Sequence, residues 1–257
     1  MTVSLRPLAW TRIGLALITI LRTTPLIRMV DPTLGAEVRP LLGWPQAGLQ
    51  LAAPGMALPA DVIRALCVVR TLALVSLLVG YRSRWSAAIA GVAGYVVVLQ
   101  NAFGFTFTQH LMFVSLFALA FTDCGAELAV RRDTPRAPVT SYWLVWLLTT
   151  SVYFWAAVAK FRRDWFDGRT LGLFYDEGKL RGPLASLFAG TAERRALSGP
   201  LVVLTELALV PLLLFPRTRG LAFLGACAFH GVVEGVARPD VFGWLMVALL
   251  LSFAKLP

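Results

Sequence analysis

The chain has 257 residues, of which 58% are hydrophobic and 15% charged, and its formal net charge is +10. Soluble domains contain roughly 25% charged residues, and a mean hydropathy of +0.72 excludes a chain built mainly of such domains. The basic residues cluster at the ends of apolar runs, which argues against nucleic acid as a partner. The three cysteines show neither zinc-site spacing nor a disulfide framework, and with two histidines we expect no metal site.

The first apolar run, residues 8–29, predicts a membrane helix. A cleaved signal peptide is not expected, because Arg22 and Arg28 follow in place of a small-residue cleavage site. A proline-rich connector comes next, and further apolar runs of about bilayer-spanning length follow along the chain. They cover residues 61–80, 85–103, 109–121 with an upstream extension through Phe105 and Phe107, 142–160, 197–215, 221–236 and 241–255.

Together these runs predict an all-α integral membrane helical bundle with about eight transmembrane helices. We expect a single transmembrane domain over residues 1–257, with no soluble lumenal domain. Residues 161–195, which follow the fifth span, are too charged to cross a bilayer. They predict an interfacial or re-entrant segment.

The arginines also predict the orientation of the chain. An even number of spans puts both termini on one side, and the positive-inside rule makes that side cytoplasmic. The loops expected there carry Arg82, Arg84, Arg131, Arg132, Arg136, Arg217 and Arg219. We therefore expect a multi-pass protein of the cell membrane with both termini cytoplasmic. Residues 161–195 are basic on the outer side, against this rule, which favours a functional role for that segment.

Lys160 stands at the end of the fifth predicted span. At helical pitch Tyr153, Ala157 and Lys160 share one face, and the neighbouring alanines let a helix or a flat ligand approach closely. Desolvation there would lower the pKa of the amine, so that it could act as a base near neutral pH. The alternative is that the side chain only extends to the lipid headgroups.

Other ionisable residues lie within the apolar runs. His110, preceded by Gln109, opens the fourth span and is expected on the same membrane side as Lys160. His230 and Glu234 share a helix face and could bond each other or point at a cavity, so His230 suits a structural and a site role equally. Interhelical salt bridges are expected for three further residues, because buried charges normally pair. These are Glu206, Arg64 and Arg70.

The ordered pattern resembles the membrane region of the vitamin K-dependent γ-carboxylases and of the related horizontally transferred transmembrane (HTTM) proteins. The block from Tyr153 to Gly168 is similar to their Tyr-x-x-Ala-x-x-x-Lys-x-x-x-x-Trp-x-x-Gly signature. The other similar pieces, in order, are Arg12-Ile13-Gly14-Leu15, Gly80-Tyr81-Arg82-Ser83-Arg84, Gln109-His110, Glu206, Pro216-Arg217-x-Arg219 and Phe229-His230.

The resemblance implies a membrane enzyme that oxidises reduced vitamin K or menaquinol with O2 to the epoxide, without a metal. Lys160 would be the base that deprotonates the quinol, assisted by His110 through a hydrogen bond. The expected quinone-binding residues are Tyr153, Ala157, Trp165, Gln109 and His230. The oxidation would drive proton abstraction from an acceptor, to which CO2 adds when carboxylation follows.

Two departures from the family pattern qualify this expectation. The carboxylases bind their protein substrate through a large lumenal domain that this sequence does not show. A small or lipid-associated acceptor, or a soluble partner protein, is therefore expected. Gln109 stands where Asn is usual, although both amides donate and accept hydrogen bonds. Two other functions stay open, a non-catalytic quinone- or lipid-binding protein and, less favoured, a small transporter.

Overall fold

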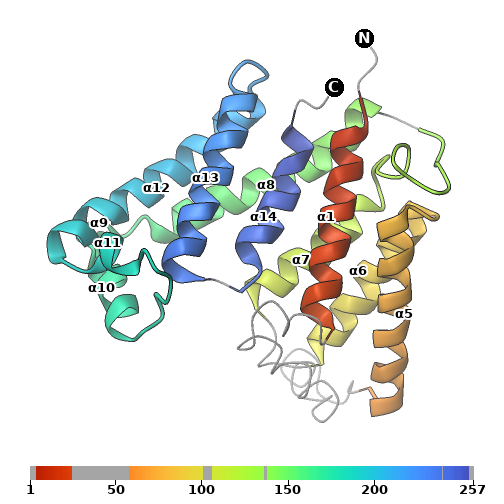
Figure 1. The fold of residues 1–257 in the computed structure, drawn as a ribbon, viewed down its shortest axis with the longest axis horizontal. Coiled ribbons are helices and arrows are strands. Elements are labelled where there is room, and N and C mark those ends of the chain that lie inside the picture. Colours follow the sequence, from red (N-terminus) through yellow and green to blue (C-terminus); the bar gives the residue numbers. More distant parts are fainter. Residues whose placement is uncertain (1–3, 25–57, 101–105, 136–137, 239, 255–257) are drawn as a thin grey trace. The chain divides into compact units, whose positions relative to one another are not determined.

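The computed structural model describes residues 4–24, 58–100, 106–135, 138–238 and 240–254 (Figure 1). Within these ranges the regular structure is entirely helical and no strand occurs, which confirms the all-α prediction. The chain packs as two compact units, residues 1–145 with 256–257, and residues 146–255. The proline-rich connector, Arg28, Phe105 and Arg136 lie outside the described residues.

The first unit contains four long helices. They are α1 (Arg6–Thr23), α5 (Ala60–Val79), α6 (Ser83–Leu99) and α7 (Phe107–Leu119). Helix α6 packs against α5 and α7, and α1 packs against the same two helices. Gly80 makes the tight turn from α5 to α6, with φ at 77° and its N–H bonded to Leu77 O. A side chain there would collide with Ala129, since a Cβ would lie 2.5 Å from Ala129 Cβ.

Two arginines, the buried Arg12 and the half-buried Arg84, hold the loop that follows α7. Arg12 of α1 is fully buried, and its guanidinium donates to the carbonyl oxygens of Cys124, Glu127 and Leu128. These bonds satisfy three backbone acceptors that the buried loop would otherwise leave unpaired. The position of Arg12 in the middle of an apolar helix is thus explained by the loop it binds.

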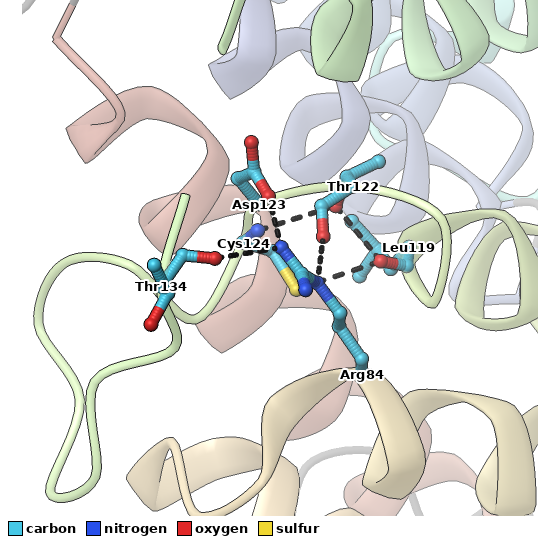
Figure 2. A network of polar contacts seen from close by, with 6 residues as sticks. All are labelled: Arg84, Leu119, Thr122, Asp123, Cys124 and Thr134. Atoms are coloured by element: carbon cyan, nitrogen blue, oxygen red, sulfur yellow. Dashed lines mark hydrogen bonds and ion pairs between the residues drawn. The ribbon is translucent and has the colours of Figure 1, made fainter. Parts of the chain in front are cut away.

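Arg84 binds the same loop from the first turn of α6 (Figure 2). Its guanidinium pairs with the Asp123 carboxylate and donates to Thr122 O and Thr134 O, each at 3.2 Å. Asp123 is almost completely buried, so the pair neutralises a carboxylate that burial alone would disfavour. The arginine-rich turn after α5 therefore holds the loop after α7 in place, in addition to indicating which side of the membrane it lies on.

The second unit is built on three long helices and one shorter one. They are α8 (Pro138–Lys160, in this unit from Trp146), α12 (Ala192–Leu214), α13 (Arg219–Ala237) and α14 (Phe242–Leu250), which ends in the 3-10 turn η1 (Leu251–Phe253). Helix α13 packs against α12 and α14. Trp146 of α8 donates its indole N–H to Ser252 O at 3.0 Å, and the Arg219 guanidinium lies 4.0 Å from the centre of the Trp146 ring.

Three short helices connect α8 to α12. They are α9 (Arg163–Phe166), α10 (Arg169–Asp176) and α11 (Ala185–Ala189), and all three pack against α12. None of them is long enough to cross a bilayer. Contact with α12 is closest at Gly199, where a Cβ would lie only 1.9 Å from Trp165 O. The predicted segment 161–195 is thus helical and packed, while its interfacial or re-entrant position stays a prediction.

In the part of the chain that the structure describes, four helices are long and apolar enough to cross a membrane. They are Ala60–Val79, Tyr142–Lys160, Ala192–Leu214 and Arg219–Ala237, and three shorter apolar helices accompany them at Ser83–Leu99, Phe107–Leu119 and Phe242–Phe253. Helix α1 has 18 residues but carries three arginines. Each of these helices overlaps one of the expected ranges, and the count of eight crossings stays a prediction.

Among the described helix starts, those of α8 and α12 lie furthest from the expected residues, at Pro138 against 142 and at Ala192 against 197. Helix α8 ends at Lys160, as expected. Helix α12 begins at Ala192, ahead of the expected residue 197, because the Thr191 side chain accepts a hydrogen bond from Arg194 N and caps the helix. A threonine cap of this kind satisfies one of the N–H groups left over in the first helical turn.

Candidate functional site

Lys160 is bound by a carboxylate from another helix. Its Nζ lies 2.7 Å from Oε1 and 2.8 Å from Oε2 of Glu206, in the middle of α12, and 3.3 Å from Ala156 O. The side chains of Lys160 and Glu206 are 22% and 8% exposed. The interhelical salt bridge expected for Glu206 is therefore present, and its partner is the candidate base. Glu206 holds the Lys160 amine inside the unit, whereas a lysine extended towards the lipid headgroups would point outward.

An aromatic ring completes the surroundings of the amine. Lys160 Nζ lies 5.6 Å from the ring centroid of Trp165 in α9, within the range of a cation–π contact. The Trp165 ring in turn meets Phe174 of α10 edge to face, with 6.3 Å between ring centroids. The short helices after α8 thus bring an aromatic surface to the lysine that ends α8.

Tyr153 and His230 form a second buried pair on the same face of α8. The Tyr153 hydroxyl lies 2.8 Å from His230 Nε2 of α13, and the two residues are 2% and 3% exposed. Ala157, between Tyr153 and Lys160, is also buried. One face of α8 therefore meets α12 through Lys160 and α13 through Tyr153, which brings together four of the residues singled out from the sequence.

His110 and Gln109 belong to the first unit. His110 Nδ1 lies 3.1 Å from the hydroxyl of Tyr95 in α6, and the two rings meet edge to face. Gln109 is buried, and its backbone N–H donates to Thr106 Oγ1 at the start of α7. Because Lys160 lies in the other unit, the expected hydrogen bond between His110 and Lys160 stays a prediction.

The HTTM domain family matches residues 50–256 of this chain. The chain belongs to the HTTM family. Its domain is the membrane part of vitamin K-dependent carboxylase-like proteins. Comparison with curated proteins and with solved structures gave no match. Together with the four long apolar helices, the family identifies a membrane protein.

The HTTM match includes both buried pairs of the second unit and the His110–Tyr95 pair of the first. Chemically, the Lys160–Glu206 pair can hold or release one proton beside an aromatic surface, and Tyr153 and His230 can each donate or accept. A phenolic ring suits such surroundings, because it has an apolar body and an ionisable hydroxyl. Among the described residues, no group of three or more His, Cys, Asp or Glu side chains could hold a metal ion.

The partners of Arg64 and Arg70 differ from those expected from the sequence. The interhelical salt bridge expected for Arg64 is wrong, because its guanidinium bonds Asp61 of the same helix at 2.8 Å on an exposed surface. Arg70 is buried and does reach another helix, but it donates to the backbone oxygen Thr23 O of α1 at 3.2 Å. A backbone acceptor carries no sequence signal, so no residue pattern could have indicated this contact.

Tyr95 was also missed as the partner of His110. Its helix, α6, reads as an even apolar run in which one tyrosine does not stand out. Glu206 did carry a signal, since a carboxylate in the middle of a span requires a cation. The sequence could not tell which of the many arginines and lysines supplies it.

Proposed function

We propose that this HTTM protein is a membrane enzyme that oxidises a reduced naphthoquinone, vitamin K hydroquinone or menaquinol, with O2. The balanced reaction converts one quinol and one O2 into one quinone epoxide and one water. Lys160 is the base that removes the first proton from the quinol. The observation that carries the proposal is the Lys160 amine, held 2.7 Å from Glu206 and 5.6 Å from the Trp165 ring at the end of α8.

Glu206 gives the base a defined proton cycle. The ion pair corresponds to the state in which Lys160 has already taken a proton, because an ammonium group and a carboxylate attract each other strongly in a partly buried site. Before the next turnover the pair must lose that proton. Glu206 then keeps the neutral amine in place by accepting its N–H hydrogen bond. Lys160 and Glu206 therefore take up and release the proton together, and Lys160 does not act as an isolated amine.

The other residues of the proposed site bind and orient the quinone. Trp165 supplies a flat face next to the amine, and Ala157 is a small residue on the same face of α8. Tyr153 and His230 supply polar groups on the same face, and His110 with Gln109 assists Lys160 by hydrogen bonding. We propose that the site faces the outer side of the cell membrane, with both chain termini in the cytoplasm.

Coupling to an acceptor is the last part of the proposal. The oxidation drives removal of a proton from a small, lipid-associated or partner-borne acceptor. Where CO2 adds to the resulting carbanion, the proton taken from the acceptor ends in the water that the oxidation produces. Lys160 must then release the proton that it took from the quinol. Carboxylation then yields one proton per turnover in addition to the products.

The test is epoxide formation by the purified protein in lipid vesicles supplied with vitamin K hydroquinone and O2. Lys160→Ala should reduce the rate by about 100-fold or more, the usual contribution of a positioned general base. Lys179→Ala is the matched control, because Lys179 is an exposed lysine paired with Glu177 on the surface, and it should keep the full rate. Absence of epoxide above background from the wild-type protein would rule the enzyme out.

The ion pair also favours a second candidate, a non-catalytic quinone- or lipid-binding protein. A lysine fully engaged by a carboxylate is typical of a structural contact between helices. This alternative predicts that the wild-type protein binds quinone without turnover and that Lys160→Ala affects only its stability. A transporter, the least favoured candidate, would show quinone-independent uptake into proteoliposomes.

A further inference from the structure

The imidazole of His230 uses only one of its two nitrogens within the described residues. Nε2 is bonded to the Tyr153 hydroxyl at 2.8 Å. Nδ1 is buried and has no hydrogen-bond partner there. Phe229 and Phe242 stand against the ring, with 5.3 and 5.8 Å between ring centroids, so its surroundings are otherwise apolar. A buried nitrogen without a partner is rare in proteins and calls for one.

Glu234 presents a second unpaired atom one helical turn further along α13. Its Oε2 is buried and also lacks a partner among the described residues. A Cβ on Gly243 of α14 would lie 2.8 Å from this oxygen, so α14 packs over the carboxylate. The sequence alternative of a direct bond between His230 and Glu234 is therefore wrong, although both side chains occupy the same stretch of the helix.

The spacing of the two residues suits one intervening molecule. Side chains four residues apart on a helix have Cβ atoms about 5–6 Å apart. A water molecule between two such neighbours can accept a hydrogen bond from Nδ1 and donate one to Oε2, each of about 2.8 Å. Buried waters typically bridge polar groups that would otherwise be unsatisfied.

We propose that α13 and α14 enclose a binding site for one water molecule between His230 Nδ1 and Glu234 Oε2. This water completes a proton relay from Tyr153 through His230 to Glu234. The Tyr153 hydroxyl donates to Nε2, so Nδ1 carries the ring proton and donates to the water, which donates to the carboxylate. When a proton passes, the Tyr153 proton moves to Nε2, the Nδ1 proton moves to the water, and another water proton moves to Glu234. The Tyr153 oxygen then takes up one proton from the site, so that one proton has been carried from the site to Glu234.

The relay ends at the terminal turn of α13. Arg238 and Asp240 are the charged groups near Glu234, and both stand at the turn that leaves the helix. Tyr153, at the other end, lies two helical turns before Lys160 on the same face of α8. The relay therefore offers a route by which protons leave the buried part of the site. This role rests on the proposed function, whereas the water site does not.

Histidine-selective ¹⁵N labelling tests both the water site and the relay, because the chain has only two histidines. His110→Gln leaves His230 as the single labelled ring in magic-angle-spinning spectra of the protein in lipid. We expect the Nδ1–H tautomer, a cross-peak between Nδ1–H and water, and exchange of that proton with solvent despite its burial. In Glu234→Leu the water cross-peak should disappear and the exchange should slow at least tenfold.

Glu193→Leu is the control, because this glutamate lies in the exposed first turn of α12 and should leave the His230 spectrum unchanged. An Nε2–H tautomer, or Nδ1–H without contact to water, would overturn the site. Equal exchange rates in the wild type and Glu234→Leu would overturn the relay. None of these measurements needs quinol, so a protein without epoxidase activity would still give a decisive answer.

Discussion

At the scale of single residues, the pair Lys160–Glu206 determines what the lysine can do. Its members lie 46 positions apart and connect α8 to α12. Removing one member leaves the charge of the other partly buried and unpaired. The resulting loss in unfolding free energy exceeds the net stabilisation that the pair provides. Loss of activity in a Lys160 variant therefore has to be separated from loss of stability.

A double-mutant cycle makes that separation. Lys160→Met and Glu206→Leu should each lower the free energy of unfolding by about 1–3 kcal/mol, less than for a fully buried pair because Lys160 is partly exposed. The double variant should lose less than the sum, since neither charge is then left alone. Thermal unfolding in detergent measures the effect. Strictly additive losses would contradict the pair, and Lys179→Met should change stability by less than about 1 kcal/mol.

Cys124 supplies a pH-dependent prediction outside the membrane-spanning helices. Burial raises the pKa of its thiol from 9.0 to about 11. The neutral thiol therefore contributes its full stability below pH 9, and this contribution is lost as the pH rises towards 11. In a variant with Cys67 and Cys227 replaced by alanine, the free energy of unfolding should fall as the pH rises from 9 towards 11, relative to the same variant carrying Cys124→Ala. The same pH dependence in both variants would contradict the burial.

At the scale of elements, contact between α9 and α12 places Trp165 beside Lys160. The backbone of α9 lies directly on Gly199, and no larger residue fits without a shift. The aromatic side of the candidate site therefore depends on a glycine that touches neither the lysine nor its carboxylate.

Gly199→Ala should move α9 away from α12. We expect a loss of about 1–3 kcal/mol in unfolding free energy, as for other overpacked sites, together with weaker quenching or a shifted emission of Trp165. The matched control is Gly225→Ala in α13, where a Cβ would meet nothing within 4 Å. That change should be neutral or stabilising by about 0.5–1 kcal/mol, because alanine favours a helix over glycine. Equal losses in the two variants would refute the close contact.

At the scale of the whole molecule, the distribution of arginines predicts the orientation in the membrane. Helix α12 separates the segment with α9–α11 from the turn with Arg217 and Arg219. If α12 crosses the bilayer, these two regions lie on opposite sides. The arginines of all the loops expected on the side of the turn, taken together, predict that this side is cytoplasmic, and the basic α9–α11 segment is the exception to the rule.

Two single-cysteine variants in a background without other cysteines test this orientation. In sealed right-side-out vesicles, Lys179→Cys should react with an impermeant maleimide from outside. Arg217→Cys should react only after the membrane is opened. Labelling of both from the same side would show that α12 does not cross, and a reversed pattern would place the termini outside.

The sequence by itself determined the helices, the membrane class and the place of Lys160 at the end of α8. Helix formation and hydrophobic length are local properties, and each can be evaluated within about twenty residues of chain. The face shared by Tyr153, Ala157 and Lys160 follows from helical pitch in the same way.

Only the tertiary structure decided which groups meet. Glu206 as the partner of Lys160, the backbone oxygens bound by Arg12, and Tyr153 as the partner of His230 all depend on how segments distant in sequence pack. Several cations and carboxylates could have paired, and backbone acceptors leave no trace in the residue pattern. The choice among them is made by the register and close approach of packed helices, which no local pattern encodes.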